Sequence, residues 1–116
     1  GILRQHSRSF RRSDDSTGPV LVYSEATIYE SADDVDAQIQ EVRSTFESQS
    51  AEIETIELAS GVTATQITYE NDQGTQNVLM YYERDNLLLL IISSGQEQSY
   101  SERAQRLMIQ MISDIP

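Results

Sequence analysis

The chain lacks cysteine, tryptophan and lysine altogether. Without cysteine, disulfides, thiolate catalysis and cysteine-ligated zinc are excluded. Because lysine is missing, the eight basic residues are all arginine, and 19 acidic residues give a formal net charge of -11. An acidic body repels phosphate, so we expect no nucleic-acid partner.

Long hydrophobic runs are also missing. The longest comprises six large apolar residues, 87–92, with Asp85 and Asn86 before it and Ser93 after it. A transmembrane helix needs about 20 apolar residues, so this run does not span a membrane. A short apolar run between turn residues predicts a central strand buried on both faces. Its alternate side chains then face opposite sides: Leu87, Leu89 and Ile91 on one, Leu88, Leu90 and Ile92 on the other.

The length of 116 residues suits one domain. Residues 1–12 hold four of the arginines and no acid. We interpret residues 1–18 as a basic flexible arm or linker that can contain one irregular strand around 2–10, and 19–116 as a single domain. The arginines could hold anionic lipid or nucleic acid, lie next to a membrane, or fold back on the acidic body. The last two need the fewest assumptions.

Two helices are predicted from apolar spacing. The first covers 31–50, where Ser31 and Asp34 resemble a capping box. Its apolar stripe is narrow, formed by Val35, Ile39, Val42 and Phe46. The second covers 98–115, with a capping box at Ser99 and Glu102. Its stripe is broader: Ala104, Leu107, Met108, Met111, Ile112 and Ile115.

The remaining segments predict strands. The first strand is 19–24, and residues 51–59, 62–70, 76–84 and 87–92 form an antiparallel meander. Ser60-Gly61 and Asp85-Asn86 are the tight turns. The predicted class is α+β: an antiparallel sheet packed against two helices, in the order strand, helix, four-strand meander, helix. Each helix covers one face of the sheet, or both lie on the same side.

Four segments carry a resemblance: "SADDVDAQIQEV", "IELASGVTATQITYE", "NVLMYYERDNLLLLIISS" and "SYSERAQRLMIQMISDI". Together, over residues 31–115, they resemble the PsbP-like family, which includes the photosystem II extrinsic protein, bacterial lipoprotein relatives and a Ran-binding branch. The family opens with a hairpin bearing Pro and Trp, which has no clear equivalent in residues 1–18. The resemblance implies a PsbP-like sandwich that binds a protein, a ligand or an ion without catalysis, often exported and tethered. It transfers no functional residue.

No catalytic, cofactor or metal site is predicted. His6 is the only histidine and lies in the basic segment, so we interpret it as a disordered surface residue. Tyr69, Tyr81 and Tyr82 form a weak candidate binding surface, because tyrosine offers contact area and a hydroxyl at low entropic cost. They are also common as sheet filler, which is the favoured interpretation.

Three other groups of residues, two acidic and one of methionines, have both a structural and a functional interpretation. The acidic residues near the first helix start suit the helix dipole better than they suit calcium. Glutamates of the first meander strand guard an edge strand, although paired carboxylates also do acid–base work. The methionines suit a core better than an adaptable groove. These groups are Glu30, Asp33, Asp34 and Asp36; Glu52, Glu54 and Glu57; and Met80, Met108 and Met111.

The predicted function is a non-catalytic binding or accessory domain of an exported or membrane-tethered protein. Its expected partner is a protein or a small ligand, with no cofactor. Membrane contact is expected only through an anchor outside this chain. One alternative is a structural or oligomerisation domain, for instance a homodimer through an open sheet edge. The other is an enzyme using paired carboxylates.

Overall fold

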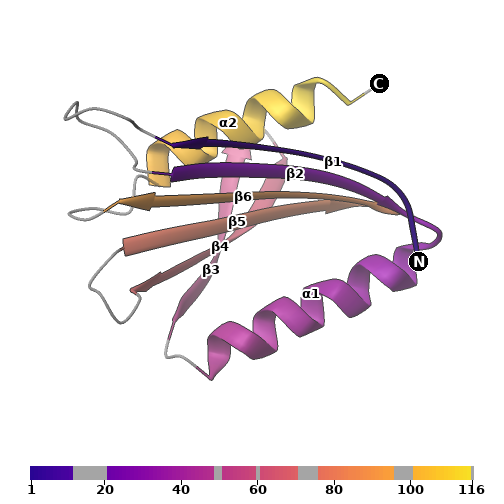
Figure 1. Cartoon of the computed structure of the whole chain (residues 1–116), viewed down its shortest axis with the longest axis horizontal. Coiled ribbons are helices and arrows are strands. Elements are labelled where there is room, and N and C mark those ends of the chain that lie inside the picture. Colours follow the sequence, from indigo (N-terminus) through magenta and orange to yellow (C-terminus); the bar gives the residue numbers. More distant parts are fainter. Residues whose placement is uncertain (12–20, 49–50, 60, 71–75, 96–100, 116) are drawn as a thin grey trace.

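A computed structural model describes residues 1–11, 21–48, 51–59, 61–70, 76–95 and 101–115. Figure 1 shows a sheet lying between two helices, α1 on one side and α2 on the other. The predicted α+β class is confirmed. The elements, in chain order, are β1 (Ile2–Arg11), β2 (Leu21–Tyr29), α1 (Ala32–Glu47), β3 (Glu52–Ala59), β4 (Val62–Glu70), β5 (Gln76–Arg84), β6 (Leu87–Gly95) and α2 (Ser101–Ser113).

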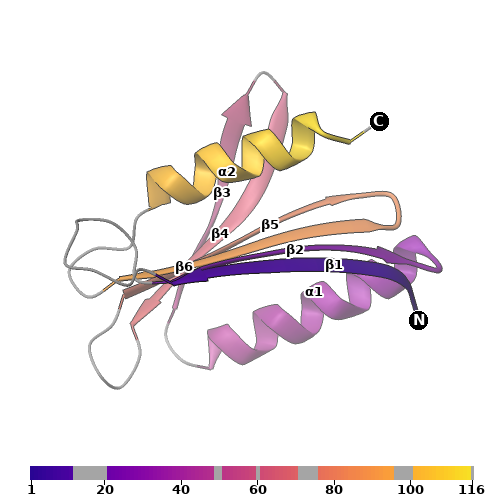
Figure 2. The ribbon, with the colours of Figure 1, turned by 45° about the horizontal axis from the view of Figure 1, so that its top comes forward.

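The six strands form one antiparallel sheet in the order β1-β2-β6-β5-β4-β3. The predicted four-strand meander is therefore present, and β6 is a central strand paired with β2 and β5. The outer strands are β1 and β3. Figure 2 shows the β3–β4 hairpin turned steeply away from the direction of β1, β2 and β6.

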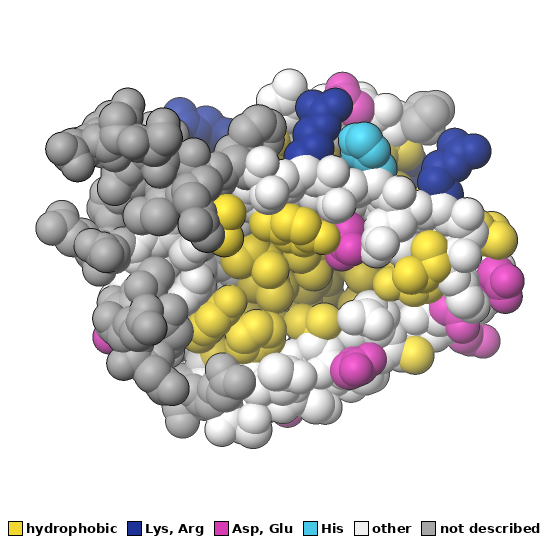
Figure 3. Space-filling model, viewed as in Figure 1, with side chains coloured by type: hydrophobic (Ala, Val, Ile, Leu, Met, Phe, Trp, Pro, Cys, Tyr) yellow, Lys and Arg dark blue, Asp and Glu magenta, His cyan; other side chains and the backbone are white. Residues whose placement is uncertain are grey.

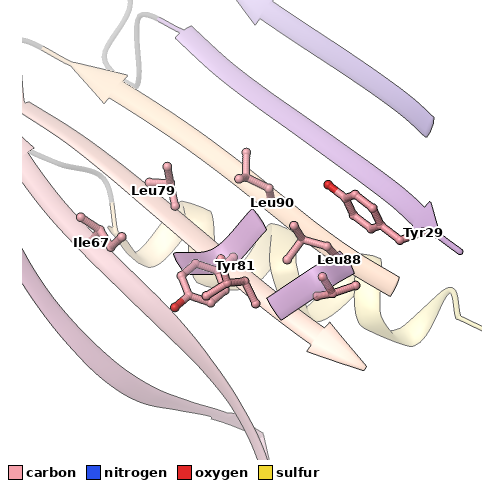
Figure 4. Packing of buried hydrophobic residues seen from close by; sticks show 8 residues of the cluster. Tyr29, Ile67, Leu79, Tyr81, Leu88 and Leu90 are labelled. Atoms are coloured by element: carbon pink, nitrogen blue, oxygen red, sulfur yellow. The ribbon is translucent and has the colours of Figure 1, made fainter. Parts of the chain in front are cut away.

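The apolar run of β6 faces two cores, as predicted. Leu88 and Leu90 belong to the α1-face core, whereas Leu89 and Ile91 belong to the α2-face core. Each core is closed by its own helix. The α1-face core comprises Tyr29, Val35, Ile39, Ile67, Leu79, Tyr81, Leu88 and Leu90 (Figure 4). The α2-face core comprises Ala64, Val78, Met80, Leu89, Ile91, Ala104 and Met108.

The first helix begins as its sequence predicts. The Oγ of Ser31 accepts a hydrogen bond from the Asp34 backbone N at 3.2 Å, which satisfies one of the free donors of the first turn. Val35 and Ile39 are buried, while Phe46 is only partly buried. The helix ends at Glu47 rather than at residue 50.

Both predicted tight turns place a residue in the left-handed region. Gly61 has φ 75° between β3 and β4, and Asp85 has φ 55° between β5 and β6. Asn86 ties the second turn to β2, because its Nδ2 donates to the Tyr29 carbonyl at 2.8 Å. Two residues of these predictions lie outside the described part of the chain: Ser99 of the second predicted capping box and Ser60 of the first predicted turn.

The N-terminal segment differs from the predicted flexible arm. Residues 2–11 form β1, an edge strand whose ladder runs from Ile2 opposite Tyr29 to Arg11 opposite Leu21. The strand expected within the arm around 2–10 is thus present, and β2 continues beyond residue 24 to Tyr29. Polar residues occupy most of β1, so it shows no hydrophobic period, and its backbone pairing stabilises it instead. Residues 12–18 of the predicted arm lie outside the described residues.

Candidate functional site

A groove lies on the α2 face of the sheet, between α2 and the β1–β2 edge. Its cavity volume is about 650 Å³, within the range of about 300–1,000 Å³ that small-molecule pockets occupy. The lining comes from four elements and the β5–β6 turn: His6, Arg8, Ser24, Glu25, Ala26, Ile28, Asn86, Leu87, Leu89, Leu107, Gln110, Met111, Asp114 and Ile115.

The groove exists because one helix cannot cover this face. Six antiparallel strands about 4.8 Å apart span about 24 Å, whereas a helix with its side chains is about 10 Å wide. Helix α2 lies over β5, β6 and part of β3. Ala104 and Met108 are buried there, while Leu107, Met111 and Ile115 at the side of the helix stay partly exposed. Among the described elements, no helix lies over β1 and β2 on this face, whereas α1 contacts β2 on the other face.

The register of β1, β2 and β6 determines which residues form the floor of the groove and which form its outer wall. His6 lies opposite Ala26, and Ala26 lies opposite Leu89, so these three form one row across the sheet. In the next row Arg8 lies opposite Ser24. The floor is therefore small and apolar, and the wall on β1 is basic.

The two ends of the groove differ in charge. Arg8 and Ser24 mark one end. Glu25, next to Ser24, also lines the groove, but its carboxylate accepts hydrogen bonds from Gln5 and from the Tyr23 hydroxyl on the α1 face. Ile28 is four residues further along β2 than Ser24, which is about 13 Å. In both Figure 1 and Figure 2 the C-terminal end of α2 lies on the same side of the molecule as the start of β1. Asp114 and Ile115 therefore lie toward the end away from Arg8, together with Asn86 of the β5–β6 turn.

The basic wall is electrostatically unusual in this acidic chain. Within the described residues both ion pairs involve the N-terminal ammonium, with Glu30 and with Asp34, so no carboxylate pairs with Arg4 or Arg8. Figure 3 shows basic side chains beside the histidine along the upper rim, with an acidic side chain next to one of them. Because Arg4 and Arg8 form no ion pair with the described residues, an anion at this rim can pair with them.

His6 and Arg8 were not among the predicted site residues. The prediction of a disordered histidine is wrong in one respect: His6 belongs to an ordered strand, although it is exposed. The sequence did contain one indication of the groove. The apolar stripe of α2 has more residues than the helix buries against the sheet. Met80 and Met108 are fully buried, as predicted, whereas Met111 lines the groove.

The structure does not bring the three predicted tyrosines together. Tyr69 and Tyr81 lie on the α1 face, while Tyr82 is partly buried against the α2-face core. Tyr81 is 5% exposed and its hydroxyl accepts from Arg43 Nη1 at 3.4 Å. The Tyr69 ring lies 4.5 Å from that of Phe46, and burial raises the pKa of the Tyr69 hydroxyl. These are packing roles.

The carboxylates also lie apart from the groove. Glu52 and Glu54 share one face of β3, opposite Thr68 and Gln66, and Glu57 faces the other side. Of the glutamates weighed as acid–base candidates, none lines the groove. The N-terminal ammonium, 2.9 Å from Asp34 Oδ2, lowers the pKa of that carboxyl. In the part of the chain that the structure describes, no group of three or more His, Asp or Glu could hold a metal.

A second apolar hollow is visible on the other face. In Figure 3 apolar side chains gather above α1 and below the β1 and β2 strands. Tyr23 of β2 and Ile92 of β6 are partly buried against the α1-face core. Gln5 Nε2 donates to Thr27 Oγ1 at 3.2 Å and to Glu25 on this face, so the amide nitrogen of Gln5 has two acceptors.

Comparisons with protein-family models, curated proteins and solved structures found no match for this chain. Neither helix in the described ranges is long and apolar enough to cross a membrane. The chemistry of the groove itself is therefore the basis for a functional proposal.

Proposed function

We propose that the protein is a non-catalytic binding domain that takes a small amphipathic ligand into the groove between α2 and the β1–β2 edge. The observation that carries this proposal is the groove: about 650 Å³, with apolar residues on its floor and helix wall and polar side chains on the β1 wall and at its ends. Most small-molecule sites combine these two features, because apolar contact supplies affinity and isolated polar groups fix orientation.

The groove supports binding better than catalysis. Its lining includes Ser24 of β2, His6 of β1 and Asp114, which follows the end of α2. Among the described residues no hydrogen bond is found that joins His6 to either of them. A nucleophile, its base and an orienting carboxylate must lie in hydrogen-bond contact, and this arrangement does not provide that.

The wider setting of this proposal is a PsbP-like accessory domain, exported or tethered to a membrane by an anchor outside this chain. What supports it is the sequence resemblance over residues 31–115 together with the element order β2, α1, four-strand meander, α2. Members of that family bind without catalysis. An extracytoplasmic location follows from the resemblance alone, and secretion of a full-length tagged protein from its native host tests it.

Binding is tested with a neutral solvatochromic dye, Nile red, and the uncharged ligand dodecanol as competitor. Met111→Glu places a charge in the groove wall, while Ile109→Glu places it on the same helix outside the lining, at a side chain that is 38% exposed. We expect dye enhancement and its displacement in the wild type and in Ile109→Glu, and loss of both in Met111→Glu. Equal binding by both variants would remove the groove as the site.

A second candidate is self-association through β1. Ile2 and Leu3 are 54% and 63% exposed on this edge strand, which is unusual for large apolar side chains beside an open ladder. The β1 arginines oppose a symmetric β1–β1 contact through like-charge repulsion. Sedimentation at micromolar concentration tests the idea: a dimer that Leu3→Lys converts to monomer supports it, and a monomeric wild type rules it out.

A further inference from the structure

We infer that the groove selects an anionic amphiphile, a single-chain carboxylate whose head group lies at Arg8 and whose tail lies along the apolar floor. This inference rests on the proposed function and names the class of its ligand. It depends on two features of the described residues: the unequal charge of the two groove ends, and basic side chains without an acidic partner.

The head-group position follows from the register. Arg8 lies opposite Ser24, and His6 lies one row further along the same wall. A carboxylate at this end meets the guanidinium, which presents a fork of N–H donors matching its two oxygens. The Ser24 hydroxyl adds a further donor beside it. Because no carboxylate of the described chain pairs with Arg8, the ligand does not displace an internal partner.

The tail position follows from the floor and the helix wall. From Ala26 the floor continues to Ile28 and Leu87, and Leu107, Met111 and Ile115 face it from α2. An extended alkyl chain fits such a strip, and each buried methylene contributes about 0.8 kcal/mol to transfer from water in general. Methionine adapts its shape readily, which suits chains of varying conformation.

The far end of the groove fixes the direction of the ligand. Asp114 follows the end of α2, which lies on the same side of the molecule as the start of β1, and Asn86 bonds the Tyr29 carbonyl at that end of β2. A carboxylate head placed there would meet like charge, and one placed at Arg8 meets opposite charge. The unequal ends therefore give one orientation for a long-chain carboxylate, and they do not favour a cationic amphiphile at Arg8.

The test compares two ligands of equal chain length, dodecanoate and dodecanol, by calorimetry below their micellar concentrations. We expect the wild type to bind dodecanoate about tenfold more tightly, the scale of one charge-assisted hydrogen bond. Arg8→Gln should abolish this preference, so that dodecanoate binds no more tightly than dodecanol, and Arg8→Lys should keep a preference. Arg106→Gln, an exposed arginine outside the groove lining, is the matched control and should behave as the wild type.

The outcomes separate the two proposals. If both ligands bind in the groove with equal affinity, or if Arg8→Gln keeps the preference, the charge selection is refuted and the binding function stands. If neither ligand binds, or if Met111→Glu leaves binding intact, the proposed function itself fails. Asp114→Asn should bind dodecanoate at least as tightly as the wild type, and weaker binding would contradict the assigned orientation.

Discussion

The two faces of the sheet are closed by helices of different character. On the α1 face a helix with a narrow apolar stripe is positioned by directed contacts: the Ser31 cap, the Arg43–Tyr81 hydrogen bond and the Phe46–Tyr69 ring pair. On the α2 face a helix with a broad stripe buries Ala104 and Met108 and leaves Leu107, Met111 and Ile115 beside a groove. The comparison teaches that apolar surface beyond what the core requires can mark a site.

The largest expected effect tests whether both faces are cores at all. Leu89 and Leu90, 3% and 9% exposed, face opposite sides of β6. Leu89→Asp and Leu90→Asp should be similarly severe, each costing about 4–7 kcal/mol, because burial raises a carboxyl pKa by several units. Urea unfolding and soluble yield measure this, with Leu→Met at the same positions as controls. Near-native stability of either variant would mean that its face is open.

The next effect concerns the attachment of α1. Phe46 is partly buried, so Phe46→Ala should cost about 1–3 kcal/mol, less than the 3–5 kcal/mol typical of a buried phenylalanine. We also expect α1 to be the less firmly attached helix, so its amides should exchange faster than those of α2 in hydrogen-exchange measurements. If Phe46→Ala lowered the free energy of unfolding by less than about 0.5 kcal/mol, Phe46 would not hold α1 to the sheet. Slower amide exchange in α1 than in α2 would mean that α1 is the more firmly attached helix.

A smaller effect probes polar atoms on the α2 face. Ser93 is 1% exposed, lies opposite Val78, and its Oγ has no hydrogen-bond partner in the structure. A buried hydroxyl without a partner is destabilising, so Ser93→Ala should leave stability unchanged or raise it by up to about 1 kcal/mol. Thermal unfolding measures this. A loss above about 1 kcal/mol would show that the hydroxyl makes a bond in solution.

The smallest effect is a pH dependence at Glu83, near the end of β5. Burial first, and the neighbouring Asp36 carboxylate next, raise the pKa of Glu83. The folded state then binds the proton more tightly than the unfolded state, so Glu83 lowers stability as pH rises through its raised pKa and has no effect below the ordinary value near 4.5. Since Glu83 is exposed, Glu83→Gln should stabilise by less than about 0.5 kcal/mol at pH 7. If Glu83→Gln stabilised the protein equally at pH 4, the gain would not depend on the charge of Glu83 and would come from packing.

Most of the fold was predictable, because its signals are local. The run 87–92 indicated a strand buried on both faces, Ser31 with Asp34 indicated a helix start, and the residues at 61 and 85 indicated turns. Each rests on a period or on a side-chain preference that acts within a few residues. The helix and strand ends are the least certain part of such predictions, and α1 indeed ends three residues earlier.

The edge strand and the groove were not predictable in the same way. Hydrophobic periodicity indicates which side chains are buried. Because β1 buries few side chains, its sequence shows no apolar period, although its backbone pairs with β2. The groove depends on where α2 lies across a sheet wider than itself, which is a tertiary fact. His6 and Arg8 became site residues only because β1 pairs at that edge.

The central claim is that the α2 face, and not the hollow on the α1 face, takes the ligand. Methyl-resolved NMR during a dodecanoate titration tests it most directly, because methyl groups line both faces. We predict shifts in the groove methyls of Ala26, Ile28, Leu87, Leu107, Met111 and Ile115, with Val35, Ile39, Leu79 and Ile92 unchanged. Shifts confined to the second set would contradict the claim and place the site beside α1.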